Sequence, residues 1–210
     1  MQKALYLTLD GVDGCGKSTQ AKRIAARLGA IQTKEPGGTE LGTLLRATLL
    51  DPQLAGKIDA MAELLLMNAD RVQHFHEVVL PGLQAGRHVV SDRSFLSSLA
   101  YQGYGRGIPV ELIHALTGLV LGELLPHRMF VLDIDFEQMA ERRGKGEHDA
   151  SDRFELEQDS FRARVMEGFR AEAARAAGFN AVLIDARADE QTVEDRIWAH
   201  IEPLLPKEAM

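Results

Sequence analysis

The chain of 210 residues has a single cysteine, Cys15, no apolar run long enough to span a membrane, and fewer basic than acidic side chains. One cysteine excludes an internal disulfide and favours a reducing compartment. A membrane-spanning helix needs about 18–20 consecutive apolar residues, and no stretch approaches that length. The N-terminal MQKALYLTLD lacks the apolar core of a signal peptide. We therefore expect a soluble cytoplasmic protein.

The charge and the hydrophobic content limit the function further. A formal net charge of −7 argues against nucleic acid as the main partner, because phosphate backbones are bound by basic surfaces. With 45% hydrophobic residues the chain can bury a sizeable core, and its length suits one domain over residues 1–210. It contains no repeat, low-complexity tract or Pro/Ser-rich linker that would divide that domain.

Short apolar runs alternate with longer helical stretches. The apolar runs are nearly continuous, as expected for parallel strands covered on both faces, and span residues 4–10, 30–34 (the weakest), 88–92, 128–133 and 181–185. Helices are expected over residues 18–28, 39–50, 58–83, 110–121, 136–143, 155–177 and 190–205. This alternation predicts an α/β fold with a doubly wound sheet, whose ligands lie beyond the carboxyl ends of the strands. All runs except the second end in an aspartate: Asp10, Asp92, Asp133 and Asp185.

The first apolar run is followed by GVDGCGKS, which fits the phosphate-binding pattern G-x-x-x-x-G-K-[ST]. Its glycines allow backbone N–H groups to wrap a phosphate, and the next helix adds the positive end of its dipole. Lys17 offers a charge to the β and γ phosphates, and the Ser18 hydroxyl is placed to bind Mg²⁺. The alternative is a chance glycine-rich turn. The predicted ATP-binding residues are Gly11, Val12, Asp13, Gly14, Cys15, Gly16, Lys17, Ser18 and Thr19.

Several classes of protein share this loop, and the rest of the chain narrows the choice. A switch GTPase also needs a guanine-reading N/T-K-x-D segment. The nearest late segment, LIDARAD, lacks the asparagine and the lysine. A large ATPase needs a longer chain. The best interpretation is a compact kinase with a second site for a phosphate acceptor.

Further segments carry a family likeness. TKEPGGTELG follows the second apolar run, LLLMNADRVQHF lies in the long helix, and VVSDRSFLSSLAYQGYGRG follows the third run. Alone, the first suits a turn before a surface helix, and the last suits a strand end with a solvated Asp-Arg pair. Together with the phosphate-binding loop and DRFELEQDSFRARV, they resemble bacterial thymidylate kinase over nearly the whole chain.

The resemblance implies a three-layer P-loop kinase fold, in which helices flank a five-stranded parallel sheet and a mobile lid covers residues 142–153. It implies transfer of the γ-phosphoryl group from ATP to dTMP with Mg²⁺, giving dTDP for dTTP synthesis. It also implies a homodimer with no nucleic-acid or membrane partner. The dTMP phosphate oxygen attacks in line, so neither a covalent nucleophile nor a general base is needed.

The acceptor phosphate and the metal are assigned to residues near the third strand. Arg93 lies just past the strand end, where its guanidinium can hold a phosphate bidentately. Asp92, at the strand end, can bind Mg²⁺ with Ser18, or can cap a helix. Arg46 can reach the acceptor phosphate or lie on the surface. Asp13 is an acid inside the phosphate-binding loop, and family likeness assigns it to the 3′-hydroxyl of dTMP.

Family likeness also indicates which residues contact the base and the sugar of dTMP. Arg71 resembles the thymine-reading arginine, with a solvated helix charge as the alternative. Tyr101 resembles the residue that crowds the sugar 2′ position, so that deoxyribose fits and ribose does not. Glu35 and Pro36 belong to the substrate-binding set, and we predict a cis peptide bond between them. Further polar groups near the base come from Ser97, Ser98 and Gln102.

One position departs from the family pattern. Four residues before Arg71, on the same helix face, the family usually has a phenylalanine that stacks on thymine, whereas this chain has Met67. A thioether can pack against a ring with more flexibility. Phe75, one helical turn beyond Arg71, can also contribute to this contact, but a residue at this spacing more often belongs to the core.

The segment AERRGKGEHDASDRFE interrupts the apolar pattern between two helices. The simplest interpretation is an exposed loop of mixed charge, but in the family this segment is a lid that closes over ATP. Arg143 and Arg153 are the leading candidates to neutralise charge on the transferred phosphoryl group. We expect the lid to be poorly ordered without ATP. The predicted catalytic residues are thus Lys17, Arg93, Asp13, Arg143 and Arg153.

Two other functions stay open at this point. Another nucleoside monophosphate kinase would prefer a different acceptor among dTMP, dUMP, dCMP and AMP. A regulatory module that uses ATP as a switch would hydrolyse ATP slowly, with no dependence on an acceptor.

Overall fold

The computed structural model describes residues 4–122, 125–139, 152–175 and 180–206. Within these ranges, five parallel strands form one sheet in the order β2-β3-β1-β4-β5. The strands are β1 (Tyr6–Gly11), β2 (Ile31–Lys34), β3 (Val89–Asp92), β4 (Arg128–Asp133) and β5 (Ala181–Asp185). All five predicted strands are confirmed. β2, the weakest apolar run, lies at the edge of the sheet and is only partly buried, which explains its weak signal.

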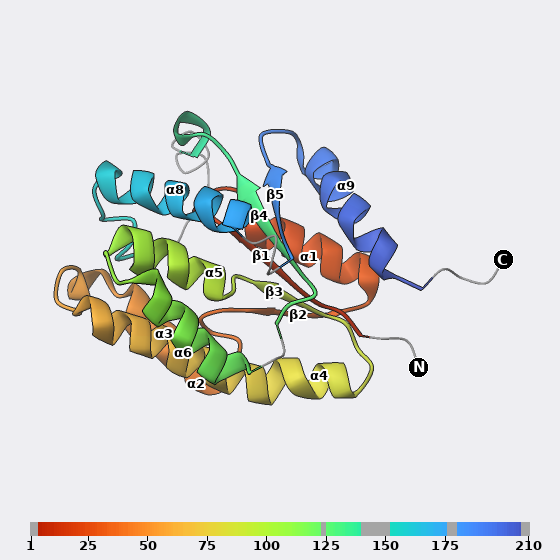
Figure 1. Ribbon diagram of the computed structural model, residues 1–210, viewed down its shortest axis with the longest axis horizontal. Coiled ribbons are helices and arrows are strands. Elements are labelled where there is room, and N and C mark those ends of the chain that lie inside the picture. Colours follow the sequence, from red (N-terminus) through yellow and green to blue (C-terminus); the bar gives the residue numbers. More distant parts are fainter. Residues whose placement is uncertain (1–3, 123–124, 140–151, 176–179, 207–210) are drawn as a thin grey trace.

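Helices cover both faces of the sheet. The connection through α1 (Lys17–Leu28) runs from β1 outward to β2, whereas the later connections cross the sheet in the opposite direction. Because such crossovers are right-handed, α1 lies on one face, where it packs against α9 (Glu190–Ile201; Figure 1). The other face carries α3 (Ala60–His74), α6 (Val110–Leu121) and α8 (Asp159–Arg175). The predicted three-layer architecture is confirmed.

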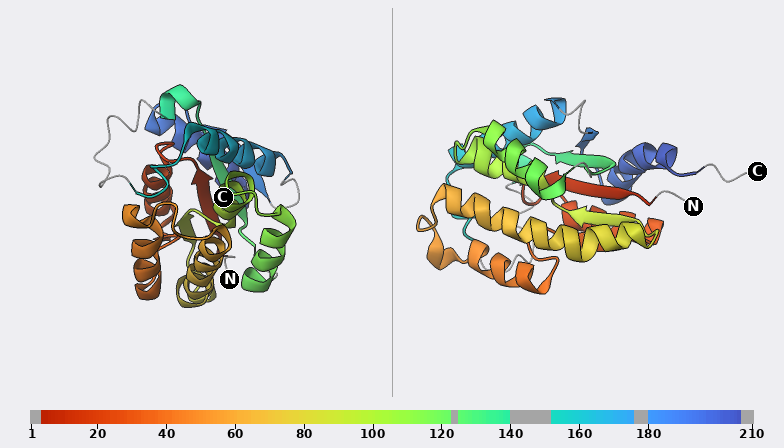
Figure 2. Two further views of the ribbon diagram at one scale, coloured as in Figure 1. Left: turned by 90° about the vertical axis from the view of Figure 1, so that its left-hand side faces the viewer. Right: turned by 60° about the horizontal axis from the view of Figure 1, so that its bottom comes forward.

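The helix expected over residues 58–83 forms as three consecutive pieces. α3 continues into the π-helical turn η2 (Phe75–Val79) and then α4 (Leu80–Gln84), and the three make one rod in Figure 2. Asp59 caps the start by accepting the Met61 N–H at 2.8 Å. The wider π turn lies directly before Pro81, whose ring would clash with a carbonyl one turn earlier in a regular helix.

The segment after β3 is helical, which the sequence pattern does not predict. α5 (Phe95–Ser98) starts at the Ser94 cap and continues as the π helix η3 (Leu99–Gly105). Glycines weaken a helical pattern, but a Cβ at Gly105 would lie 2.6 Å from the Phe161 ring of α8. Close packing of η3 against α8 therefore requires glycine at position 105. The same glycine weakens the helical pattern, so the sequence does not indicate this helix.

Other element ends shift by a few residues. α2 (Glu40–Leu50) begins one residue late, because Thr39 is its cap and accepts the Gly42 N–H at 2.9 Å. A short 3₁₀ turn, η1 (Pro52–Leu54), follows α2. α8 begins at Asp159 instead of residue 155, and α9 ends before the 3₁₀ turn η5 (Glu202–Leu204). Of the helix expected over residues 136–143, the described residues 136–139 are helical.

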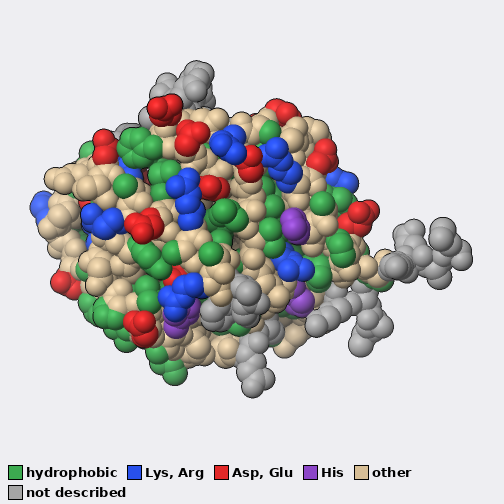
Figure 3. Space-filling view, turned by 45° about the horizontal axis from the view of Figure 1, so that its top comes forward, with side chains coloured by type: hydrophobic (Ala, Val, Ile, Leu, Met, Phe, Trp, Pro, Cys, Tyr) green, Lys and Arg blue, Asp and Glu red, His purple; other side chains and the backbone are tan. Residues whose placement is uncertain are grey.

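Two features describe the surface. In the described residues, no helix combines the length and the apolar character that crossing a membrane requires. On the face drawn in Figure 3, acidic and basic side chains are interspersed over the helices.

Candidate active site

The phosphate-binding loop joins β1 to α1 at the carboxyl edge of the sheet. Gly11 has a φ of 140° and Gly16 a φ of 93°, which side chains rarely allow, and a Cβ at Gly11 would lie 2.6 Å from the Leu132 carbonyl oxygen. Lys17 is 6% exposed, and its ammonium donates to the Val12 carbonyl at 2.8 Å. The backbone N–H groups and this ammonium form a cradle for an anion at the α1 N-terminus.

Ser18 and Asp92 meet beside this loop, as the sequence predicts for a metal site. The Ser18 hydroxyl donates to Asp92 Oδ2 at 2.5 Å. Asp92 Oδ1 is buried and has no hydrogen-bond partner among the described residues. A hydroxyl and an unsatisfied carboxylate oxygen fit Mg²⁺, which binds few protein ligands and keeps phosphate and water oxygens. No cluster of three acidic, histidine or cysteine ligands occurs in the described residues, and Mg²⁺ at a nucleotide needs none.

Arg93 follows β3 in a strained conformation. Its φ of 79° is uncommon for a residue with a side chain. Its guanidinium donates to the Gly11 carbonyl and to Ser97 Oγ, each at 3.2 Å, and also pairs with Asp13. Burial alone would lower the pKa of Arg93, but Tyr101 and the neighbouring carboxylates raise it above its ordinary value. The cation is therefore fixed between the loop and the segment after β3.

Asp10 holds the turn that contains Arg93, and the sequence offers no sign of this beyond an aspartate at a strand end. It is fully buried and accepts four hydrogen bonds: from Ser94 N–H at 3.0 Å, Ser94 Oγ at 2.7 Å, Ser97 Oγ at 2.8 Å and, within its own strand, Thr8 Oγ1 at 3.4 Å. Burial raises its pKa, and the hydrogen bonds from the two serines oppose the rise. Asp10 thus stabilises the strained turn at its base.

Asp13 joins Arg93 to Tyr101. The Tyr101 hydroxyl donates to Asp13 Oδ2 at 3.1 Å, and Lys17 Nζ lies 3.6 Å from Asp13 Oδ1. The Tyr101 ring packs edge-on against Phe154, with centroids 5.4 Å apart. Burial, followed by the charge of Asp13, raises the pKa of Tyr101, so the phenol stays neutral. The structure brings together the acid, the arginine and the tyrosine that the sequence assigned to the acceptor.

Arg71 is buried, not solvated. It is 3% exposed and its Nε donates to Glu35 Oε2 at 2.9 Å. Its Nη2 donates to the Ser94 carbonyl at 3.3 Å and to Ser98 Oγ at 3.1 Å, and Nη1 donates to Asn68 at 3.3 Å. The guanidinium therefore occupies one fixed orientation.

Glu35 is the acid that holds Arg71, and its peptide bond to Pro36 is cis, as predicted. The His74 ring, which the sequence did not indicate, donates from Nδ1 to Glu35 Oε1 at 2.9 Å and lies 2.8 Å from Thr33 Oγ1 through Nε2. Burial would raise the pKa of Glu35, but Arg71 and His74 hold it below its ordinary value.

The Pro-Gly-Gly turn carries two more side chains. Arg46 reaches back from α2 to donate to the Pro36 carbonyl at 3.0 Å, so it lies over the turn. Asp70, absent from the predicted set, accepts the Gly37 N–H at 2.9 Å, and its Oδ2 is buried with no hydrogen-bond partner among the described residues. Burial raises its pKa.

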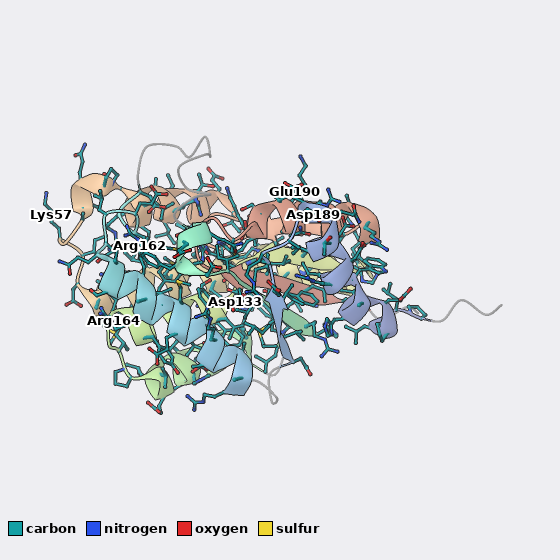
Figure 4. The ribbon with its side chains drawn as sticks, turned by 90° about the horizontal axis from the view of Figure 1, so that it is seen from above. Lys57, Asp133, Arg162, Arg164, Asp189 and Glu190 are labelled. Atoms are coloured by element: carbon teal, nitrogen blue, oxygen red, sulfur yellow. The ribbon has the colours of Figure 1, made fainter. Side chains whose placement is uncertain are left out.

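Two adjoining cavities contain these side chains. One cavity, called the acceptor cavity after the role that the sequence predicts for its residues, is lined by every predicted substrate-binding residue: Asp13, Glu35, Pro36, Arg46, Met67, Arg71, Arg93, Ser97, Ser98, Tyr101 and Gln102. The P-loop cavity is lined by Gly14, Gly16, Lys17, Ser18, Thr19 and Asp92, and its wall includes Glu190 at the start of α9 (Figure 4). Five side chains line both cavities: Asp13, Glu35, Arg46, Arg93 and Asp152.

Three residues of the loop and one of the long helix lie apart from these cavities. Gly11, Val12 and Cys15 form the inner side of the loop and do not line the P-loop cavity. Cys15 is a buried free thiol whose pKa is raised by burial, which suits a packing role. Phe75 is 6% exposed and belongs to the core cluster.

The two predicted lid arginines differ in outcome. Arg143 lies outside the described residues. Arg153 is 2% exposed, donates to Glu63 Oε2 at 2.6 Å and to the Leu49 carbonyl at 3.0 Å, and lines neither cavity. Its neighbours Asp152 and Phe154 line the acceptor cavity instead. The structure therefore does not bring Arg153 to the phosphate-binding loop, because its charge is paired with a buried carboxylate.

Comparison with known proteins identifies relatives over nearly the whole chain. Residues 9–197 match the family described as thymidylate kinase. A thymidylate kinase of Synechococcus sp. (strain JA-2-3B'a(2-13)) is 42% identical over 96% of both chains, and one of Deinococcus radiodurans is 41% identical over 96% of this chain and 98% of its own. The crystal structure of thymidylate kinase from Ehrlichia chaffeensis superposes with a TM-score of 0.73 at 28% identity, covering 95% of this chain and 98% of that chain.

Proposed function

Since the chain belongs to the thymidylate kinase family and phosphorylates dTMP to dTDP, we propose that its P-loop cavity takes ATP with Mg²⁺ and its acceptor cavity takes dTMP. One observation carries this assignment: Asp13, Glu35, Arg46, Arg93 and Asp152 line both cavities. A shared wall lets an acceptor phosphate in one cavity meet a γ-phosphate in the other, and such positioning supplies much of the catalysis of phosphoryl transfer.

The donor side of the site uses the phosphate-binding loop. Backbone N–H groups and Lys17 bind the β and γ phosphates, where the ammonium stabilises charge in a site shielded from water. Ser18 Oγ and Asp92 Oδ1 are the protein ligands for Mg²⁺. When bound, the metal ion neutralises phosphate oxygens and keeps the donor in a reactive orientation.

The acceptor side uses the charge cluster around Asp13. Arg93 binds the dTMP phosphate with the guanidinium N–H groups that its protein partners leave available. Asp13 accepts a hydrogen bond from the sugar 3′-hydroxyl, and the Tyr101 ring fills the space beside C2′. Because Asp13 pairs with Arg93 and Tyr101, the sugar and the phosphate are oriented by one connected set of side chains.

The base lies among the side chains at the far end of the acceptor cavity. Arg71, Ser98 and Gln102 supply the polar contacts, and Met67 packs against the ring in place of an aromatic side chain. Glu35 supports this end by holding Arg71 in place at 2.9 Å.

The remaining assignments concern the lid, the assembly and the compartment. Arg143 is the proposed lid arginine, and we assign no phosphate contact to Arg153. Apolar side chains exposed on the adjoining helices α2, α3 and α6 support a homodimer: Leu41, Leu44, Met61, Leu65, Val72, Leu112 and Leu119. We assign the enzyme to the cytoplasm, because its one free thiol suits a reducing compartment.

A coupled ADP-release assay tests the assignment. The full chain is assayed with ATP and Mg²⁺, without an acceptor and with dTMP, dUMP, dCMP or AMP. We expect dTMP to give the fastest release and the reaction without acceptor to be negligible. Arg93→Gln should lose about 100-fold or more, typical for one charge-stabilising donor. The control Arg170→Gln removes an arginine that is 46% exposed and lines neither cavity, and should keep full activity. Equal release with and without dTMP would exclude the proposal.

A further inference from the structure

A buried carboxylate on the first turn of α3 contacts the wall of the acceptor cavity from behind. Glu63 is completely buried and lines neither cavity. Its Oε1 accepts Gln102 Nε2 at 2.8 Å and Arg106 Nε at 3.3 Å. Its Oε2 accepts Arg106 Nη2 at 3.1 Å and Arg153 Nη1 at 2.6 Å. Both oxygens are therefore engaged by side chains from other segments.

This arrangement determines which end of the Gln102 amide faces Glu63. Two guanidinium groups donate to the carboxylate, and a carboxylate can only accept hydrogen bonds. The NH₂ end of Gln102 must therefore turn toward Glu63. The opposite end, Oε1, has no hydrogen-bond partner among the described residues, and Gln102 is part of the wall of the acceptor cavity. A carbonyl oxygen is thus available to a ligand.

The neighbouring Arg71 offers the opposite kind of group. Its Nε and Nη2 hydrogens are used by Glu35, Ser94 and Ser98, while Nη1 makes one 3.3 Å bond to Asn68 and has a second hydrogen. A guanidinium has five donors and no acceptor. The cavity wall therefore combines an acceptor from Gln102 with a donor from Arg71.

That pair of groups matches one class of pyrimidine edge. Thymine and uracil present an N3–H donor beside the O4 acceptor, whereas cytosine presents an N3 acceptor beside the N4 donor. A site built to hydrogen-bond one pattern rejects the reversed pattern, because buried polar groups are then left unpaired.

We propose that Glu63 is a positioning residue for base selection: it holds the Gln102 amide so that Oε1 faces the base, and so selects a 4-oxo over a 4-amino pyrimidine. The proposal rests on the function proposed above, since it needs the base of the acceptor in this cavity. Glu63 acts through Gln102 and does not contact the nucleotide.

The charges around Glu63 predict what an amide would do at this position. In Glu63→Gln, the side-chain oxygen is drawn to the Oε2 position, where Arg106 Nη2 and Arg153 Nη1 make the shorter guanidinium bonds, at 3.1 and 2.6 Å. The NH₂ group takes the Oε1 position and gives up the longer bond from Arg106 Nε at 3.3 Å. That NH₂ group then faces Gln102 and requires an acceptor from it. Gln102 rotates, and its own NH₂ group turns to the cavity, where it suits cytosine N3.

The test measures dissociation constants of dUMP and dCMP for the full chain by titration calorimetry. These two nucleotides differ only at N3 and position 4, so the 5-methyl group of dTMP does not enter the comparison. We expect the dCMP/dUMP ratio of Kd to fall about tenfold in Glu63→Gln, which corresponds to the loss of one hydrogen bond. Arg106→Gln is the matched control: it weakens the same cluster but leaves the carboxylate, and its ratio should stay within threefold of wild type.

Three results would overturn the proposal: a ratio that falls less than threefold in Glu63→Gln, an equal fall in Arg106→Gln, or a wild-type ratio near one. If Glu63→Gln does not fold, the double variant Glu63→Gln/Arg106→Gln removes one charge of each sign and is judged by the same limits against Arg106→Gln. If the wild-type protein phosphorylates dTMP but the dCMP/dUMP ratios of Kd fall outside these limits, only the role of Glu63 is excluded and the proposed function stands. A protein without dTMP-dependent ADP release excludes the proposed function.

Discussion

Breaking the buried Glu35–Arg71 ion pair should lower the free energy of unfolding substantially. Glu35 is 5% exposed and Arg71 3% exposed, so neither charge is compensated by solvent. Glu35→Gln keeps the shape of the side chain and leaves Arg71 three weaker neutral acceptors at 3.1–3.3 Å. Removing one partner of a buried pair costs about 3–5 kcal/mol because the other charge stays buried. Since the unfolding free energy of a domain is about 5–15 kcal/mol, we expect the midpoint of urea unfolding to shift to a much lower urea concentration.

The measurement is equilibrium unfolding in urea with the m-value compared between variants, so that a change in midpoint reports stability alone. The control is Asp159→Asn, which removes the partner of Arg162 in a 2.6 Å ion pair whose aspartate is 75% exposed. Such exposed pairs contribute about 0–1 kcal/mol. A loss in Glu35→Gln no larger than in the control would refute the claim that Arg71 depends on this carboxylate.

Acid titration provides a second test of the same pair. The pKa of Glu35 lies below its ordinary value of 4.5 because Arg71 and His74 outweigh the effect of burial. The folded state therefore binds this proton less readily than the unfolded state, and the stabilisation is complete above pH 4.5 and lost as the pH falls through the lowered pKa. The difference in unfolding free energy between wild type and Glu35→Gln should shrink over that range.

Three further predictions concern the loop, the sugar and the sheet. Lys17→Ala should lower kcat more than tenfold, since tenfold is only about 1.4 kcal/mol, while circular dichroism shows an intact fold. Tyr101→Phe should keep the discrimination between dTMP and its ribose analogue, whereas Tyr101→Ala should weaken it about 5- to 150-fold, measured as a ratio of kcat/KM. Burial lowers the pKa of His88 from 6.5, and its Nδ1 accepts the Leu5 N–H at 2.9 Å. Stability should therefore fall as the pH drops from 6.5 through the lowered pKa, and fall less in His88→Asn, whose amide oxygen accepts the same bond without titrating.

The parts predicted from the sequence are those in which residue type and spacing carry the signal. The phosphate-binding loop has glycines at fixed intervals, and the strands are continuous apolar runs, so both were found. The sequence pattern does not predict the π helix η3, because the glycine at position 105 is required by close contact with Phe161, which lies more than fifty residues later in the chain. Propensity cannot report a contact of this kind.

Buried acids were missed for a related reason. Glu63 occupies the first turn of a helix, where an acid ordinarily complements the helix dipole and is solvated. Its burial depends on Arg106 and Arg153, which come from two other segments. Asp10 was visible only as one of four aspartates at strand ends, and the serines that use it follow a different strand. Local sequence predicts the residues that line the cavities better than the residues that hold them.

Arg153 shows how the same motif can be interpreted in two ways. In sequence, DRFE ends a basic segment and indicates a phosphate contact. In the structure, Asp152 accepts the N–H groups of Phe154 and Glu155 at 2.9 and 3.0 Å, which makes a tight turn, and the turn directs Arg153 to Glu63. Asp152 itself lines both cavities, and a carboxylate there repels phosphate. The end of this segment therefore brings the Asp152 carboxylate, and not the Arg153 guanidinium, to the wall that the two cavities share.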